Sequence, residues 1–322
     1  MNRSKHRDFS LDCMKAFAIF LVVMDHLIRK SDSPDNPVIS FIYSLHMPLF
    51  FLVSGILSAK KIDNGHDIWK FWKRKSKLLI PVVVWGLGNV LILKQDIQEF
   101  LIWHKFGLWF LWTLFLFFTL YAISQLCLIK NKNRQIETVG LIFPAVVCIA
   151  LRVFQNTELG GVFNFLNLYN YIFFVLGVMI KRYDWAKIVM SEKVSTLFFA
   201  IYIVGLFTEI NALNLPMKAC GILFVFMVAT KFTYGFHDDE MNKVQRLIVF
   251  VGQNSLYIYI LHYYLIQGLQ PMAPVYHDLI FSTPCYYLPF YILIAFGIIA
   301  ISIAIAKVLN MNRIVGLLLF GR

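Results

Sequence analysis

The chain is short of the residue patterns that mark metal sites, disulfide frameworks and phosphate loops. Only five cysteines occur among 322 residues, and they show no paired or metal-ligand spacing. The eight histidines are equally dispersed. No glycine-rich phosphate loop is present. We therefore expect no metal. We also expect no disulfide framework, since only Cys285 falls in a segment predicted to lie outside the membrane.

Internal repeats and low-complexity segments are missing too. No matched pair of glycine- or proline-broken helices suggests an inverted-repeat transporter. The first apolar run follows basic residues, as in a signal peptide, but no small-residue cleavage site follows it, and Asp25 and His26 interrupt it. We expect this run to be retained as a helix. One domain over residues 1–322 is the simplest division.

The chain is rich in hydrophobic residues, which form long apolar runs. Hydrophobic residues make up 59%, with 31 Phe and a mean hydropathy of +0.68. Apolar runs of about 20 residues match a bilayer core roughly 30 Å thick. We predict an all-α, polytopic membrane protein with about ten transmembrane helices, at residues 9–28, 38–59, 78–94, 106–129, 136–153, 164–180, 194–210, 214–234, 247–267 and 287–309.

The formal charge of +12 is distributed unevenly along these helices. If both termini are cytoplasmic, 23 of the 30 Lys and Arg residues fall on the cytoplasmic side and 6 on the outer side, with Lys15 inside a helix. This bias is what the positive-inside rule predicts for that orientation. It accounts for most of the basic character, so we expect no nucleic-acid partner.

The first helix carries an unusual set of ionisable residues: Asp12, Lys15, Asp25 and His26. Such residues inside a membrane helix are candidates for function. Lys15 and His26 are eleven positions apart, which places both on one face of a helix about 16 Å apart. Asp12 and Lys15 can pair at i,i+3. We predict that His26 is a general base oriented by Asp25; Lys15 reaching the headgroups and His26 contacting interfacial water are the alternatives.

Two further histidines are predicted at a similar depth. His46 lies about 12 Å from the outer end of the second helix, and His262 lies near the outer end of the ninth. Pro48 can bend the second helix and open a cavity there. We predict that His46 and His262 position the substrate whose proton His26 removes. For Ser54 and Gly55 we favour close helix packing over a catalytic serine.

A dense basic segment follows the second helix. Its cations are interleaved with Trp69, Phe71 and Trp72, as in a helix at the membrane surface that is free to bind phosphates. Its partner is either anionic lipid or the phosphates of a nucleotide cofactor. The cations within eight positions are Lys70, Lys73, Arg74, Lys75 and Lys77.

Aromatic residues near the outer ends of helices are weaker candidates. Trp109 and Trp112 fit an interfacial aromatic belt, with substrate stacking as the alternative. Tyr257 is a second candidate for substrate contact. Arg152 and Glu209 are ionisable residues at predicted outer ends that could pair.

These motifs together resemble the membrane acyltransferase-3 family, the integral membrane O-acyltransferases of bacterial surface sugars. The likeness covers nearly the whole chain and is closest to fucose 4-O-acetylase-like and enterobacterial common antigen acetyltransferase-like proteins. Lys15 stands where arginine is commoner in the family, and Ala16 where glycine is. The resemblance rests on Arg7-x3-Leu11-Asp12-x2-Lys15-x10-His26, SLHMPLFFLVSGIL from Ser44, KRKSKLLIP from Lys73, LWFLWTLF from Leu108 and GQNSLYIYILH from Gly252.

The resemblance implies transfer of an acyl group, with acetyl expected and succinyl the alternative, from acyl-CoA to a hydroxyl of a cell-surface saccharide or lipid-linked sugar. It also implies a bacterial inner-membrane location and a donor bound by Lys15, Lys73, Arg74 and Lys77. Direct transfer and a His26 acyl intermediate are both open. A transporter or flippase for a glycan or lipid is the alternative function, and release of coenzyme A distinguishes the two.

Overall fold

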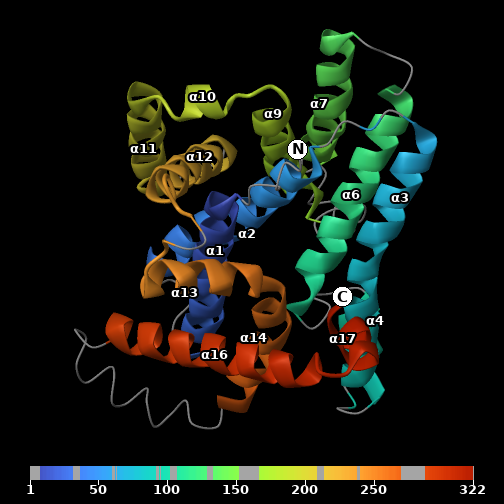
Figure 1. The fold of residues 1–322 in the computed structure, drawn as a ribbon, viewed down its shortest axis with the longest axis vertical. Coiled ribbons are helices and arrows are strands. Elements are labelled where there is room, and N and C mark those ends of the chain that lie inside the picture. Colours follow the sequence, from blue (N-terminus) through green and yellow to red (C-terminus); the bar gives the residue numbers. More distant parts are fainter. Residues whose placement is uncertain are drawn as a thin grey trace. The chain divides into compact units, whose positions relative to one another are not determined.

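The computed structural model describes most of the chain, and the backbone of these residues forms helices joined by turns, with no strand (Figure 1). They group into two compact units, one built from Met1–Val53 and Asp184–Lys307 and the other from Ser54–Tyr183 and Val308–Arg322. The described residues are 8–31, 37–59, 62, 64–91, 94, 96–101, 107–128, 133–151, 167–208, 214–237, 240–269 and 287–321.

The first unit is built around α1 (Phe9–Ser31), which contacts α12, α13 and α14. Side chains of α1 such as Met14, Ala18 and Val23 are fully buried. In Figure 1, α11 and α12 pack as a pair in the same unit. The remaining elements are α2 (Pro37–Ser58) as far as Val53, α10 (Ala186–Val189), α11 (Glu192–Leu206), α12 (Asn214–Phe232), α13 (Lys243–Gln253), α14 (Ser255–Leu269) and α16 (Tyr287–Leu309).

The second unit has an aromatic core. Tyr171 packs on Phe117 and Phe174 with ring centroids 5.2 and 5.7 Å apart. A side chain at Gly55 would overlap the main-chain oxygen of Phe174, so this glycine permits close helix packing. The elements are the end of α2, α3 (Gly65–Lys75), η1 (Ser76–Leu78), α4 (Leu79–Leu91), α5 (Ile97–Leu101), α6 (Trp109–Leu128), α7 (Arg134–Ala150), η4 (Leu168–Asn170), α9 (Tyr171–Arg182) and α17 (Arg313–Phe320).

Each of the ten predicted ranges overlaps a helix among the described residues, but the ninth prediction is wrong in one respect. The range 247–267 is not continuous, because α13 ends and α14 begins around Asn254. Asn254 closes α13, with its Nδ2 donating to the carbonyl of Phe250 at 2.7 Å. A short amide side chain that bonds its own backbone competes with helix continuation, and Ser255 then starts the next helix.

Four helices among the described residues are long and apolar enough to cross a membrane: Val38–Ser58, Trp109–Leu128, Asn214–Phe232 and Leu288–Leu309. The chain is therefore that of a membrane protein. α1 has the length, at 23 residues, but carries Asp12, Lys15, Asp25 and Arg29. The number of ten spans, the cytoplasmic termini and the single domain stay predictions. Arg152, Glu209 and Cys285 lie outside the described residues.

Candidate active site

The pair of Asp12 and Lys15 predicted near the start of α1 is present. Lys15 Nζ lies 2.7 Å from Asp12 Oδ1, and the carboxylate side chain is 4% exposed. The spacing i,i+3 brings the two side chains together on one side of the helix. Asp12 thus holds the ammonium of Lys15 close to α1, at the end of the helix where the chain enters it.

Asp25 pairs with Arg29, and its role in orienting His26 stays a prediction. Arg29 Nε donates to Oδ1 of Asp25 at 2.9 Å, one helical turn further along α1. Adjacent residues on a helix diverge by about 100°, so Asp25 and His26 point to different sides. The guanidinium of Arg29 also lies 4.6 Å above the ring centre of Tyr43 in α2. Asp25 therefore positions Arg29 between α1 and α2.

The ring of His26 packs near that of a second histidine. Its ring centre lies 5.2 Å from that of His262 in α14, and the edge of Tyr263 approaches it at 5.9 Å. Tyr259 lies 5.9 Å from His262, one turn earlier on α14. His26 is half-buried and His262 is 1% exposed. Two of the three predicted histidines thus form a pair lined by tyrosine rings.

The hydrogen bonds of His262 define which of its nitrogens can act on a ligand. Nδ1 lies 2.9 Å from the carbonyl oxygen of Ile258, and because a carbonyl only accepts, Nδ1 carries the proton. Nε2 then holds a lone pair. It is buried and has no hydrogen-bond partner among the described residues. A buried acceptor without a partner is costly unless a ligand supplies the donor. The site is therefore suited to receive a hydroxyl.

His46 has the same internal arrangement in α2. Its Nδ1 donates to the carbonyl of Ile42 at 2.7 Å, and the residue is 5% exposed. Tyr43 packs edge-on against its ring at 5.2 Å. Because Arg29 lies over the ring of Tyr43, α1 and α2 are linked next to His46. The sequence reading overlooked Arg29 and Tyr43, although the i,i+4 spacing of Asp25 and Arg29 was a usable signal.

The glycine that opens the motif GQNSLYIYILH fixes how closely α13 approaches α1. A side chain at Gly252 would overlap the main-chain oxygen of Asp12, so only glycine permits this approach. Ten residues later the same motif places His262 against His26. Gly252–His262 therefore contacts α1 at both of its polar positions.

The two aromatic residues predicted to contact substrate are Tyr257 in the first unit and Trp109 in the second. The rings that pack on the histidine pair belong to Tyr259 and Tyr263, while Tyr257 lies about 140° around α14 from His262. Trp109 begins α6 in the second unit, with its ring centre 6.4 Å from that of Phe110. The roles of Tyr257 and Trp109 as substrate residues stay predictions.

The basic segment is an amphipathic helix in the second unit. Ile68 and Phe71 of α3 are buried, and Trp72 Nε1 donates to Thr119 of α6 at 3.1 Å. Lys75 turns inward, with its amine 4.0 Å above the ring of Phe118. The exposed cations share the opposite face at spacing i, i+3, i+4 and i+7: Lys70, Lys73, Arg74 and Lys77. This face can bind phosphates. Lys73, Arg74 and Lys77 on it are predicted to bind the donor, and that role stays a prediction.

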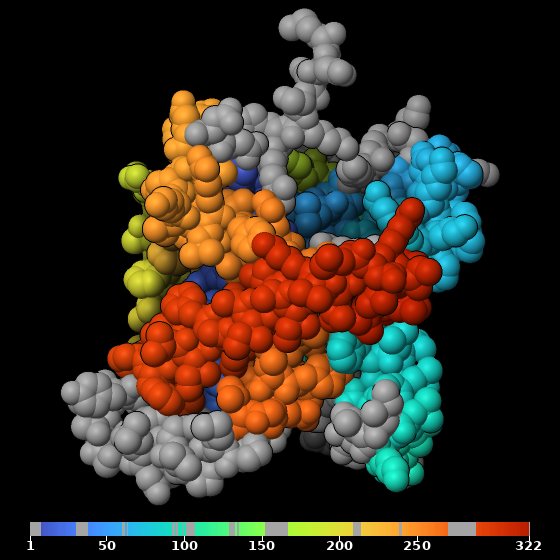
Figure 2. Space-filling model, turned by 60° about the horizontal axis from the view of Figure 1, so that its bottom comes forward, coloured from blue at the N-terminus to red at the C-terminus, as the bar shows by residue number. Residues whose placement is uncertain are grey.

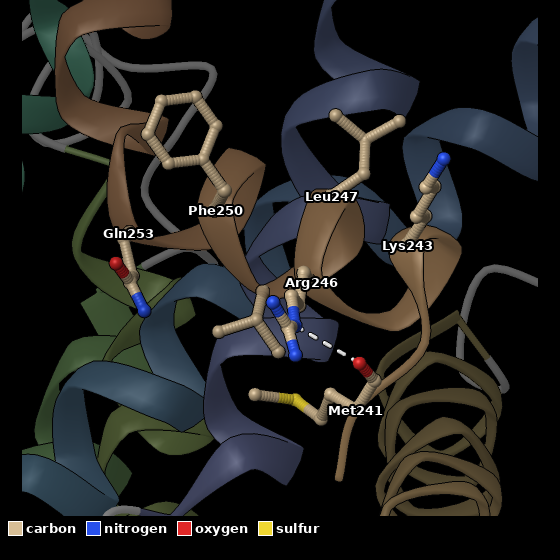
Figure 3. A pocket seen from close by; sticks show the side chains of 7 residues that line it. Met241, Lys243, Arg246, Leu247, Phe250 and Gln253 are labelled. Atoms are coloured by element: carbon tan, nitrogen blue, oxygen red, sulfur yellow. Dashed lines mark hydrogen bonds between the residues drawn. The ribbon is translucent and has the colours of Figure 1, made fainter. Parts of the chain in front are cut away.

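A second basic feature lies on α13 and was not predicted. Lys243, Arg246 and Gln253 line a hollow of about 520 Å³ together with apolar residues (Figure 3). Arg246 points toward Met241, and its Nε donates to that residue's carbonyl oxygen at 2.9 Å. The bond orients the guanidinium along the wall of the hollow.

Taken together, the apolar helices and the pair of His26 and His262 define a membrane protein with a polar site inside a helical unit. The family described as Acyltransferase domain (acyltransferase-3) matches residues 8–307, and the chain belongs to this family. The match includes α1, the histidine pair, the basic helix α3 and most of α16.

Two curated relatives carry the name Nodulation protein NolL. The protein of Mesorhizobium japonicum (strain LMG 29417 / CECT 9101 / MAFF 303099) is 27% identical over 223 residues, which cover 61% of this chain and 57% of the relative. That of Sinorhizobium fredii (strain NBRC 101917 / NGR234) is 34% identical over 88 residues, covering 26% and 24%. The matches thus span 57% of the first relative's length and 24% of the second's. No solved structure matches it.

Proposed function

We propose that this protein is a membrane O-acyltransferase that moves an acyl group, with acetyl expected, from acyl-CoA to a hydroxyl of a cell-surface or lipid-linked saccharide. The family supports acyl transfer. The observation that carries the proposal is the pair of His26 and His262, which sets an unpartnered acceptor nitrogen beside a second imidazole. A hydroxyl placed between them has a base to take its proton.

In the proposed reaction the acceptor hydroxyl gives its proton to His26 as its oxygen attacks the thioester carbonyl carbon. The carbon–sulfur bond then breaks, and the coenzyme A thiolate leaves with the proton returned by His26. The products are an ester and a free thiol. General-base catalysis of this kind contributes about 10²- to 10⁴-fold in rate. Nε2 of His262 accepts from a neighbouring sugar hydroxyl and so orients the acceptor.

The donor is proposed to enter from the cytoplasm. Lys15, held by Asp12, and the exposed cations Lys73, Arg74 and Lys77 supply positive charge for its phosphates. The pantetheine arm follows the α1 face from Lys15 toward His26, about 16 Å at helical rise. Chemistry then takes place nearer the outer end of α1, and no free acyl group crosses the membrane. The proposed location is the bacterial inner membrane, with multiple spans.

The most informative test of the function is mass spectrometry of surface glycans from cells with and without the protein. One acyl mass should be present on a saccharide only when the protein is made, and the His26→Ala variant should not restore it. An unchanged acylation pattern, with glycan missing from the surface, would favour the transporter alternative.

Neutralising Arg74 and Lys77 together, as Arg74→Gln and Lys77→Gln, is expected to raise the KM for acyl-CoA by up to about 30-fold, because each exposed ion pair contributes up to about 1 kcal/mol. The double variant would still bind the donor through its remaining exposed cations. Its affinity for acyl-CoA should therefore fall as the salt concentration rises. Initial rates measured against acyl-CoA concentration check this. Arg313→Gln, an exposed cation on α17, is the control. An unchanged KM with lost dependence on anionic lipid would mean that α3 only anchors the protein to the membrane.

Oriented, sealed vesicles should show that the two substrates act from opposite sides. Acyl-CoA is expected to support transfer only from the cytoplasmic face, and a water-soluble saccharide to accept only from the other face, since the basic residues and the histidines are predicted at different depths. The measurement is product formation with each substrate confined to one side. Equal acylation when both are confined to the cytoplasmic face would contradict the predicted depths.

A further inference from the structure

An apolar groove of about 780 Å³ runs between α1, α13 and α16 in the first unit. From α1 it is lined at i, i+3, i+4 and i+7 by Cys13, Ala16, Phe17 and Phe20, which form one face of the helix. Phe20 meets Phe296 of α16 with ring centres 5.3 Å apart. In Figure 2 a patch of dark blue atoms from α1 shows between the orange atoms of α13 and the red atoms of α16.

The groove is separate from the face proposed for the donor. At about 100° per residue, its α1 side chains lie about 140° around the helix from the direction shared by Lys15 and His26. A ligand in this groove therefore lies on the far side of α1 from the histidine pair. The proposed acyl transfer does not use this groove, so a ligand bound there would be neither the donor nor the acceptor.

One end of the groove is positively charged. Lys307, in the last turn of α16, is exposed, and its amine lies 5.0 Å above the ring centre of Phe250. Phe250 and Leu247 also line the neighbouring hollow, which carries Lys243 and Arg246 (Figure 3). None of the described residues lining the groove or the hollow is acidic. A long apolar slot with cations at one end fits an amphiphile whose head is anionic.

We propose that this groove binds one acyl chain of an anionic phospholipid, whose phosphate lies against Lys307 with Lys243 and Arg246 next to it. The charge bias along the sequence assigns this end of α16 to the cytoplasmic side, where such a headgroup would face the basic residues. The chain then extends along Phe17 and Phe20 toward the middle of the membrane. This site does not depend on the proposed acyl transfer, and it can be tested without an activity assay.

The test uses the purified full-length protein and phosphatidylglycerol with a photoreactive group in one acyl chain. Cross-links mapped by mass spectrometry should fall on α1, α13 and α16 at groove residues. Unlabelled phosphatidylglycerol should compete about five-fold better than phosphatidylcholine of the same chain length, the equivalent of about 1 kcal/mol for one cation. Lys307→Gln should remove this preference. Lys193→Gln, an exposed cation on α11 away from the groove, should keep it.

A second variant tests the apolar part. Ala300→Trp places a large ring in the groove at an exposed position of α16, so it should reduce cross-linking of both lipids while the unfolding midpoint is retained. Equal competition by the two lipids, unchanged in Lys307→Gln, would overturn the proposal. The proposal would also be overturned if acyl-CoA protected the groove residues from cross-linking and Lys307→Gln bound acyl-CoA more weakly. The occupant would then be the acyl donor.

Discussion

Replacing His26 with alanine is expected to lower the rate of acyl transfer by about 10²- to 10⁴-fold, the contribution of a positioned general base. The loss should appear in kcat, because the imidazole moves a proton during the reaction. The protein should remain folded, since His26 is only half-buried and its ring is not part of the tightly packed face of α1. The measurement is the initial rate of ester formation by purified protein at saturating acyl-CoA.

Two other histidines provide the controls for this result. His66→Ala removes an exposed imidazole at the start of α3 and should leave the rate unchanged. His262→Ala should lower the rate less than His26→Ala and raise the KM for the saccharide, because His262 is proposed to orient the acceptor. If His26→Ala is well folded and fully active, His26 is not the base.

Gly252→Ala is expected to destabilise the protein by about 1–3 kcal/mol, the usual cost of overpacking. The added methyl group would overlap the main-chain oxygen of Asp12, and backbone cannot move away as a flexible side chain can. α13 would have to shift from α1, which also displaces the Asp12–Lys15 pair. Transfer should therefore fall with stability. The measurement is the midpoint of thermal unfolding in detergent, alongside the transfer rate.

Gly297→Ala is the matched control for this prediction. Gly297 lies in α16 of the same unit, and a side chain there meets nothing within 4 Å. The same substitution should then be neutral or stabilising by up to about 1 kcal/mol, because alanine favours helix over glycine. Equal unfolding midpoints for both variants would show that the contact between α1 and α13 is looser than described.

The positions of the helices could be read from the sequence because long apolar runs in a membrane chain have few other solutions. The break at Asn254 was overlooked in this way, since only four residues separate the apolar run 247–251 from the next run, 256–261. A local signal was nevertheless present in Asn254 and Ser255, which cap helices more readily than they continue them.

The sequence selected the candidate residues of the site but not their contacts. His26, His262 and Lys15 were chosen because ionisable residues are rare in apolar helices. The partner of Asp25 was missed because neighbours in sequence were taken as neighbours in space, whereas a helix joins i to i+4. The approach of Gly252 to Asp12 joins positions far apart in the chain, and only packing determines such a contact.

The central claim is tested most directly by the release of coenzyme A from purified protein. With acyl-CoA and a saccharide acceptor, free thiol should appear in step with ester, require the acceptor, and be lost in His26→Ala. The result that would contradict the claim is movement of the saccharide across a liposome membrane with no thiol released, since that is transport without transfer.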